Sequence, residues 1–163
     1  MPKTEREKLS RRVTNPWLMR VFLITQLPLG WFAGLRVRRL EPELCEATVP
    51  YGWRTKNPFR STYFAAQSMA AELSTGALAM VAVKSTKVPV AMLIVDMEGT
   101  FGKKATSLVT FRCEEGSKIS AAVQEAERTG DPVVARVETV GRMGDGTEVS
   151  RFHFTWSFKR RSS

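Results

Sequence analysis

Residues 61–83 restrict the folding of this chain more than any other segment. This segment contains no proline, one glycine (Gly76) and one charged residue, Glu72. Its many alanines and other apolar residues predict one long helix, and a helix that is apolar almost all round must be buried on nearly every side. At about 1.5 Å per residue this helix would be roughly 34 Å long, the width of a small domain. The rest of the chain must therefore wrap around it.

The segments on either side of this helix supply strands that can form such a wrapper. Strands are expected at residues 35–40, 44–49, 90–101, 105–113, 133–142 and 148–159, the last two joined as a hairpin across residues 144–146. In the last strand, alternate residues are aromatic: Phe152, Phe154, Trp156 and Phe158. That alternation indicates an antiparallel sheet with one buried and one wet face.

In residues 90–101 the apolar residues Ala91, Leu93, Val95, Met97 and Phe101 are expected to face one way. The sequence therefore predicts an α+β fold, with about six antiparallel strands curved round one long central helix.

Shorter helices are expected before and after the central helix. Thr4 and Glu7 are spaced as a capping box for a polar helix through Arg12, and Asn15-Pro16 is typical of a second helix start. A short amphipathic helix is expected at about residues 117–129, with Gly130 following its last turn. We divide the chain into an N-terminal helical extension, residues 1–27, and a main domain, residues 28–163. At this length the two parts are expected to form a single domain overall.

The net charge of +9 lies at the two ends of the chain. Residues 1–40 carry nine bases and two acids, residues 151–163 carry four bases and no acid, and the remaining residues have a net charge of −2. A solvated basic face and attraction to a polyanion both fit this pattern. No nucleic-acid-binding motif accompanies the charge, so no nucleic acid partner is expected. Residues 1–27 also resemble a basic amphipathic stretch that could contact anionic membrane, although packing on the domain is the simpler interpretation.

Cysteine content and the N-terminal residues predict a cytoplasmic protein. Two cysteines, Cys45 and Cys113, are too few for a disulfide framework or a metal site. The first residues are charged, unlike a signal peptide, and the apolar stretch at residues 17–35 is interrupted by polar residues, proline and glycine.

Residues 57–76, Asn-Pro-Phe-Arg-Ser-Thr-Tyr-Phe-Ala-Ala-Gln-Ser-Met-Ala-Ala-Glu-Leu-Ser-Thr-Gly, resemble the core motif of hotdog-fold acyl-CoA thioesterases. The similarity is to the phenylacetyl-CoA and 4-hydroxybenzoyl-CoA type, in a subfamily with no assigned substrate. In that motif an amide residue precedes a His-Gly-Gly-Ala stretch that opens the helix, and an acidic residue follows. Asn57 takes the amide position, Tyr63 the His position, Phe64-Ala65 the Gly-Gly positions and Glu72 the acidic position.

The resemblance implies a catalytic role for Glu72, Asn57 and Phe64, and a substrate-binding role for Tyr63 and Ala65. Glu72 would be the general base or nucleophile, the Phe64 N–H would polarise the thioester, and Asn57 would position it. Two structural alternatives stay open. The carboxylate of Glu72 could reach the surface or accept a core hydrogen bond, for instance from Ser68 or Thr75, and Asn57 could serve only its own turn.

Coenzyme A is expected as part of the substrate and not as a cofactor. Four basic residues are candidate contacts for its phosphates: Lys56, Arg60, Lys103 and Lys104. The only histidine, His153, falls on the wet side of the last strand, and a surface role is favoured over a catalytic one.

Helix geometry predicts a homodimer if both Phe64 and Glu72 act. The two residues are eight positions apart, which is roughly 12 Å along one helix, so a single thioester carbonyl cannot touch both in one chain. The site would then lie between two chains, as in the family. Whether two such dimers stack as a dimer of dimers is left open by the sequence. The favoured function is an acyl-CoA thioesterase. The alternative is a non-catalytic hotdog domain that binds acyl thioesters or acts as an interaction module, since Phe64-Ala65 replaces the Gly-Gly pair.

Overall fold

The computed structural model describes residues 15–161, so the helix expected over residues 4–12 lies outside the described range. In chain order the elements are α2 (Pro16–Gln26), α3 (Pro28–Ala33), β1 (Arg36–Leu40), β2 (Cys45–Val49), α4 (Phe64–Lys84), β3 (Val90–Phe101), β4 (Val109–Cys113), α5 (Gly116–Thr129), β5 (Val133–Met143) and β6 (Glu148–Arg160).

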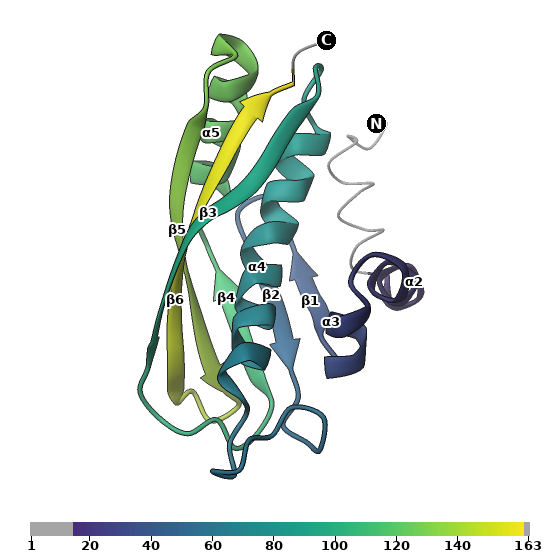
Figure 1. Ribbon diagram of the computed structural model, residues 1–163, viewed down its shortest axis with the longest axis vertical. Coiled ribbons are helices and arrows are strands. Elements are labelled where there is room, and N and C mark those ends of the chain that lie inside the picture. The colour runs from purple at the N-terminus through teal and green to yellow at the C-terminus, as the bar shows by residue number, and fades with distance from the viewer. Residues whose placement is uncertain (1–14, 162–163) are drawn as a thin grey trace.

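The six strands form one antiparallel sheet in the order β1-β2-β4-β5-β6-β3. The sheet curls around α4, with β3 and β1 at its two edges on either side of the helix (Figure 1). A long helix inserted between the second and third strands and wrapped by the sheet is the hotdog arrangement, so the predicted fold class is confirmed.

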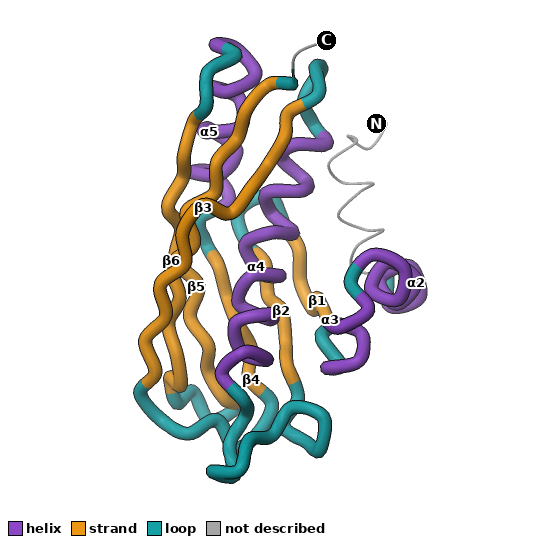
Figure 2. Tube along the Cα trace, in the orientation of Figure 1, coloured by secondary structure: helices purple, strands orange, loops and turns teal. Residues whose placement is uncertain are grey.

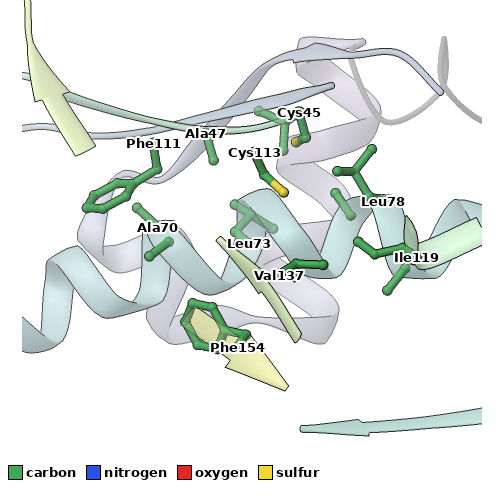
Figure 3. Close-up of a cluster of buried hydrophobic side chains, with 14 of the residues drawn as sticks. Cys45, Ala47, Ala70, Leu73, Leu78, Phe111, Cys113, Ile119, Val137 and Phe154 are labelled. Carbon is green, nitrogen blue, oxygen red and sulfur yellow. The ribbon is translucent and has the colours of Figure 1, made fainter. Parts of the chain in front are cut away.

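Helix α4 lies in the core because its side chains are small and apolar on most faces. Thirteen of its 21 residues are buried, which leaves only a narrow part of its circumference uncovered. Figure 3 shows helix residues packed among side chains of the sheet and α5; the labelled contributors include Ala70, Leu73, Leu78, Phe111, Ile119, Val137 and Phe154. Alanine side chains let the sheet approach the helix closely.

Two buried hydroxyl groups attach α4 to the sheet. Ser74 Oγ lies 2.8 Å from Thr139 Oγ1 of β5, and Trp156 Nε1 of β6 donates to Thr75 Oγ1 at 3.1 Å. Buried polar groups need such partners, so the two bonds favour one rotation of α4 about its own axis.

That rotation leaves one stripe of the helix partly exposed. Its members recur at helical spacing and are Ala65, Ser68, Met69, Glu72, Met80 and Val83, here called the open stripe of α4. Glu72 is the only charged residue on it.

The central helix begins three residues later than predicted, at Phe64. The chain before it is held by other elements, because Thr62 N donates to Ala105 O and Tyr63 N donates to Thr55 O, both at 2.7 Å. These bonds keep residues 61–63 extended against neighbouring loops. The strand expected from residue 105 likewise begins only at Val109.

The expectation that the apolar residues of β3 face one way is wrong. The register with β6 shifts between Ile94 and Asp96. Before the shift Leu93 lies opposite Ser157 on the outer face, and after it Met97 lies opposite Phe154 on the inner face. A bulge adds one residue and so exchanges the two faces of the strand.

Asn15 caps α2, as the sequence predicts. Its side-chain oxygen accepts from Trp17 N at 3.0 Å and from Leu18 N at 3.4 Å. Pro28 begins the separate helix α3, and Leu23 and Ala33 place both helices against the core. Within residues 15–161, no helix has the length and apolar character needed to cross a membrane.

Candidate active site

The carboxylate of Glu72 lies on the open stripe at mid-helix and makes no hydrogen bond or ion pair with any residue in the described range. Neither expected structural donor reaches it. Ser68 Oγ donates to Phe64 O at 2.9 Å, and Thr75 Oγ1 donates to the backbone oxygen of Glu72 at 3.0 Å. The chain therefore holds an acidic group in a largely apolar setting without a structural partner.

Burial raises the pKa of the Glu72 carboxyl, because desolvation disfavours the charged form. No described cation opposes this shift. Removing a carboxylate from water without compensation is costly for a fold. An uncompensated carboxylate with a raised pKa is typical of functional sites.

Gly76 makes room for this carboxylate, a role that the sequence did not suggest. A Cβ at position 76 would lie 2.7 Å from Glu72 Oε1 and 3.4 Å from the ring of Trp156. Any larger residue would displace the acid or the indole. The available signal was the spacing: the single glycine of the helix follows its single charge by four residues, on the same face.

The first turn of α4 presents unsatisfied backbone donors. Tyr63 occupies the N-cap without a side-chain hydrogen bond, and the first helical bond runs from Gln67 N to Tyr63 O at 3.1 Å. Within residues 15–161, the N–H groups of Phe64, Ala65 and Ala66 have no acceptor, and the first turn contains no acidic residue. Such a helix start favours negative charge.

Three half-exposed aromatic side chains stand beside this helix start. The ring centroids of Tyr63 and Phe64 are 4.9 Å apart, and those of Phe64 and Phe101 are 6.3 Å apart. Phe101 in turn contacts the buried ring of Phe152 at 5.5 Å. Sequence reasoning missed Phe101 as a site residue, because only the fold brings the end of β3 to the start of α4.

The side-chain amide of Asn57 is occupied within its own loop. Its oxygen accepts from Phe59 N at 3.0 Å and from Ser61 N at 3.2 Å, and its nitrogen donates to Ser61 Oγ at 3.1 Å. Of the two roles left open by the sequence, this geometry favours the turn-forming one. Asn57 shapes the loop that leads into Tyr63.

The four basic candidates lie in two loops at the end of the molecule where α4 begins, as Figure 2 shows for the loops. The bond from Thr62 N to Ala105 O joins these loops, as does Lys104 Nζ, which donates to Phe59 O at 3.2 Å. Lys56, Arg60 and Lys103 are exposed, and none has an ion pair with a described residue.

Other chemically active side chains lie away from this end of α4. His153 Nε2 lies 3.1 Å from Glu138 Oε2 on the outer face of the sheet. Cys45 and Cys113 are buried register partners on β2 and β4, and burial raises the pKa of the Cys113 thiol to about 11. Among residues 15–161, no group of three or more His, Cys, Asp or Glu side chains is arranged to hold a metal ion.

The structure does not bring Glu72 to the free N–H groups within one chain. Both belong to α4, with Phe64 at its first position and Glu72 eight residues on, roughly 12 Å along the axis. Both nevertheless lie on the uncovered side of the helix, beside β3, whose outer edge has no neighbouring strand among residues 15–161.

Comparisons with known proteins agree with this fold. The family model described as "Domain of unknown function (DUF4442)" matches residues 15–158. No curated protein matches the chain.

Solved structures give similar backbones at low sequence identity. A Pseudomonas aeruginosa protein of unknown function, described as a "Probable Thioesterase", aligns with a TM-score of 0.74 and 19% identity over 92% of this chain and 99% of its own. A Shewanella oneidensis protein related to the thioesterase superfamily gives 0.68 and 11% identity over 95% and 98% of the two chains. A Haemophilus influenzae thioesterase gives 0.61 and 14% identity over 98% and 93%. These proteins share the hotdog fold.

Replacing Glu72 with Gln should stabilise the protein above the ordinary pKa of a glutamate. Because burial raises the pKa of Glu72 in the folded state, the folded chain binds this proton more tightly than the unfolded chain does. The stability from the neutral carboxyl is complete below the ordinary value of 4.5 and is lost as pH rises through the raised value. Thermal melts from about pH 3 to about pH 9 should therefore show that the melting temperature of Glu72→Gln exceeds that of wild type by an amount that grows as pH rises and then levels off. A wild type at least as stable as Glu72→Gln at neutral pH would mean that the carboxylate has a stabilising partner.

Proposed function

The chain belongs to the DUF4442 family, and on that premise we propose that this member is a thioesterase that hydrolyses acyl-CoA thioesters. The observation that carries the proposal is the unpartnered, partly buried carboxylate of Glu72 on the open stripe of α4. Its position matches the acidic position of the phenylacetyl-CoA and 4-hydroxybenzoyl-CoA thioesterase motif. The thioesterase-like structural neighbours support the same class.

In this proposal the Glu72 carboxylate acts on the thioester either as a general base or as a nucleophile. As a general base it takes a proton from water while the water oxygen bonds to the acyl carbon, and the C–S bond then breaks as the thiol leaves with a proton. As a nucleophile its oxygen bonds to the acyl carbon while the C–S bond breaks and the thiol leaves with a proton, and water then hydrolyses the resulting anhydride to the acid and free Glu72. The raised pKa of Glu72 makes its carboxylate a stronger base than that of an ordinary glutamate.

The free N–H groups at the start of α4 stabilise the negative charge on the carbonyl oxygen. They point out of the helix with the positive end of the dipole behind them, and charge on an oxyanion is where such donors have their largest effect. Phe64 N–H is the leading donor because the motif places it there.

Two chains complete each site in this proposal. An exposed apolar edge strand favours pairing with another strand, and β3 presents Leu93, Val95 and Met97, each at least half exposed, along its free edge. Antiparallel pairing of two β3 strands would set the α4 helices side by side in opposite directions. Glu72 of one chain could then approach the first turn of the partner's helix.

The surroundings of the helix start suggest how substrate binds. Tyr63, Phe64 and Phe101 offer an aromatic wall for the acyl group. Lys56, Arg60 and Lys103 lie at the same end with free ammonium or guanidinium groups, as the phosphates of coenzyme A require.

One observation favours a non-catalytic acyl-thioester-binding domain as the second candidate. The Phe64 side chain stands where the motif has glycine and backbone approaches the thioester. In that case acyl-CoA would bind without release of free thiol.

Glu72→Gln keeps the size and hydrogen-bonding capacity of the side chain but removes its base and nucleophile. We expect thioester turnover, read as free thiol from a panel of acyl-CoA thioesters, to fall by about 10²-fold or more. Substrate binding by calorimetry should persist. Glu72→Asp retains a carboxylate on a shorter side chain, so its turnover should lie between those of wild type and Glu72→Gln. Unchanged turnover in Glu72→Gln would remove Glu72 from the mechanism.

Phe64→Pro deletes the proposed oxyanion donor at little structural cost. Proline is well tolerated at the first helical position, and Tyr63 already has the extended conformation (φ −58°, ψ 137°) that a residue before proline prefers. The matched control is Phe64→Ala, which loses the same ring but keeps the N–H. We expect kcat to fall about 10²-fold or more in Phe64→Pro relative to Phe64→Ala. Equal rates in the two variants would exclude this N–H as the donor.

Mixed dimers test whether two chains share a site. Glu72→Gln and Phe64→Pro, each inactive alone, are unfolded together and refolded so that chains pair at random. In a mixed dimer one site receives both lesions and the other receives neither. Half of the dimers are mixed, so activity should return to about a quarter of wild type, as two-fold symmetry requires.

Mass spectrometry under native conditions confirms that mixed dimers have formed. If each chain held a complete site, every site in a mixed dimer would carry one lesion. Mixed dimers without recovered activity would therefore contradict the shared site.

A further inference from the structure

A second surface lies at the opposite edge of the sheet from β3, where α2 and α3 lie beside β1 (Figure 1). A cavity of about 440 Å³ opens there. Its lining includes two tryptophans, Trp17 and Trp31, and the four arginines Arg20, Arg36, Arg38 and Arg54, but no acidic residue. The cavity is thus both aromatic and strongly positive.

These four arginines differ from those on the outer face of the sheet. There, Arg112, Arg136 and Arg151 each pair with carboxylates at 2.6–3.6 Å. The arginines of the cavity make no ion pair with any described residue, and Arg54 only stacks on Phe32 at 5.9 Å. Four guanidinium groups without carboxylates form a site that favours anions, and phosphate above all.

The helices beside the cavity expose an unusually large apolar face. Trp17 is 76% exposed and Leu29 is 65% exposed. The other large apolar residues exposed there are Leu18, Val21, Ile24, Leu27, Trp31 and Phe32. Many exposed apolar side chains on two helices that contact each other mark an interaction surface. We define the α2–α3 surface as these apolar side chains together with the four arginines of the cavity.

We propose that the α2–α3 surface docks on an anionic phospholipid membrane. The apolar face of α2 and α3 enters the boundary between headgroups and acyl chains, and the tryptophans lie at the membrane–water interface that their amphipathic rings prefer. The arginines bind lipid phosphates, and one phosphate occupies the cavity. The inference does not depend on the thioesterase activity.

Charge argues against two other occupants. A second copy placed on this surface by a two-fold axis would bring like arginines towards each other. Residues 1–14 carry five bases and two acids, so this segment of the chain does not provide the missing negative charge. An anionic bilayer complements both the apolar and the positive parts.

Vesicle flotation of the full chain tests the proposal. We expect the protein to float with phosphatidylcholine vesicles that contain about 30 mol% phosphatidylglycerol, to stay unbound with phosphatidylcholine alone, and to release as salt is raised. Arg20→Glu with Arg36→Glu should weaken the binding at least about tenfold. The matched control, Lys84→Glu with Lys159→Glu, makes the same change in net charge at exposed bases elsewhere and should bind nearly as wild type.

Further measurements separate the membrane from the other occupants. Val21→Ser with Ile24→Ser removes apolar area from the same face and should reduce flotation while the oligomeric mass stays unchanged. A wild type that stays unbound to anionic vesicles would overturn the proposal, as would equal loss in both charge-reversed pairs. A change of oligomeric mass in the serine variant would assign the surface to a second copy. Full release by soluble glycerol phosphate would assign the cavity to a free anion.

Discussion

The burial of one nearly uncharged helix governs the rest of this structure. Because α4 is apolar on most sides, the sheet has to curl around it, and the curl sets the strand order and leaves the two edge strands on either side of the helix. The hydroxyls of Ser74 and Thr75 favour the orientation of the helix, since each needs a buried partner on β5 or β6. What remains uncovered is a single stripe, and Glu72 is the one charge on it.

That arrangement explains why an energetically costly group survives in the middle of the core helix. The carboxylate has lost much of its hydration and has gained no described partner. Gly76 adds to the cost, since it is a weak helix former whose missing side chain leaves the acid its space. The proposed catalytic role of Glu72 would account for two unfavourable choices one turn apart. A general base that must be available to water and substrate would have no structural partner in the chain itself.

The two edges of the sheet differ in chemistry, and this difference suggests different partners. The β3 edge exposes Leu93, Val95 and Met97, and the arginine beside it, Arg136, is already paired with Asp96 and Glu98 of β3, which suits pairing with an identical strand. At the β1 edge, Arg36 and Arg38 lie with exposed tryptophans of α2 and α3 and have no carboxylate partner in the described part of the chain. Like charges disfavour a symmetric contact there but favour an anionic surface. One protomer can therefore use both edges at once.

The sequence by itself determined the fold class and the central acid. A 23-residue, alanine-rich stretch with one charge predicts a buried helix, and strict alternation in residues 151–158 predicts a one-sided sheet; both patterns are local. The motif likewise singled out Glu72 as the acidic residue of that helix. Tertiary structure alone decided the start of α4 at Phe64, the exchange of faces in β3, the approach of Phe101 to Phe64, and the use of Asn57 within its own turn. Each of these depends on hydrogen bonds or contacts between residues distant in the chain or on one extra residue in a strand. Such competition between local preference and long-range pairing leaves no periodic trace in the sequence.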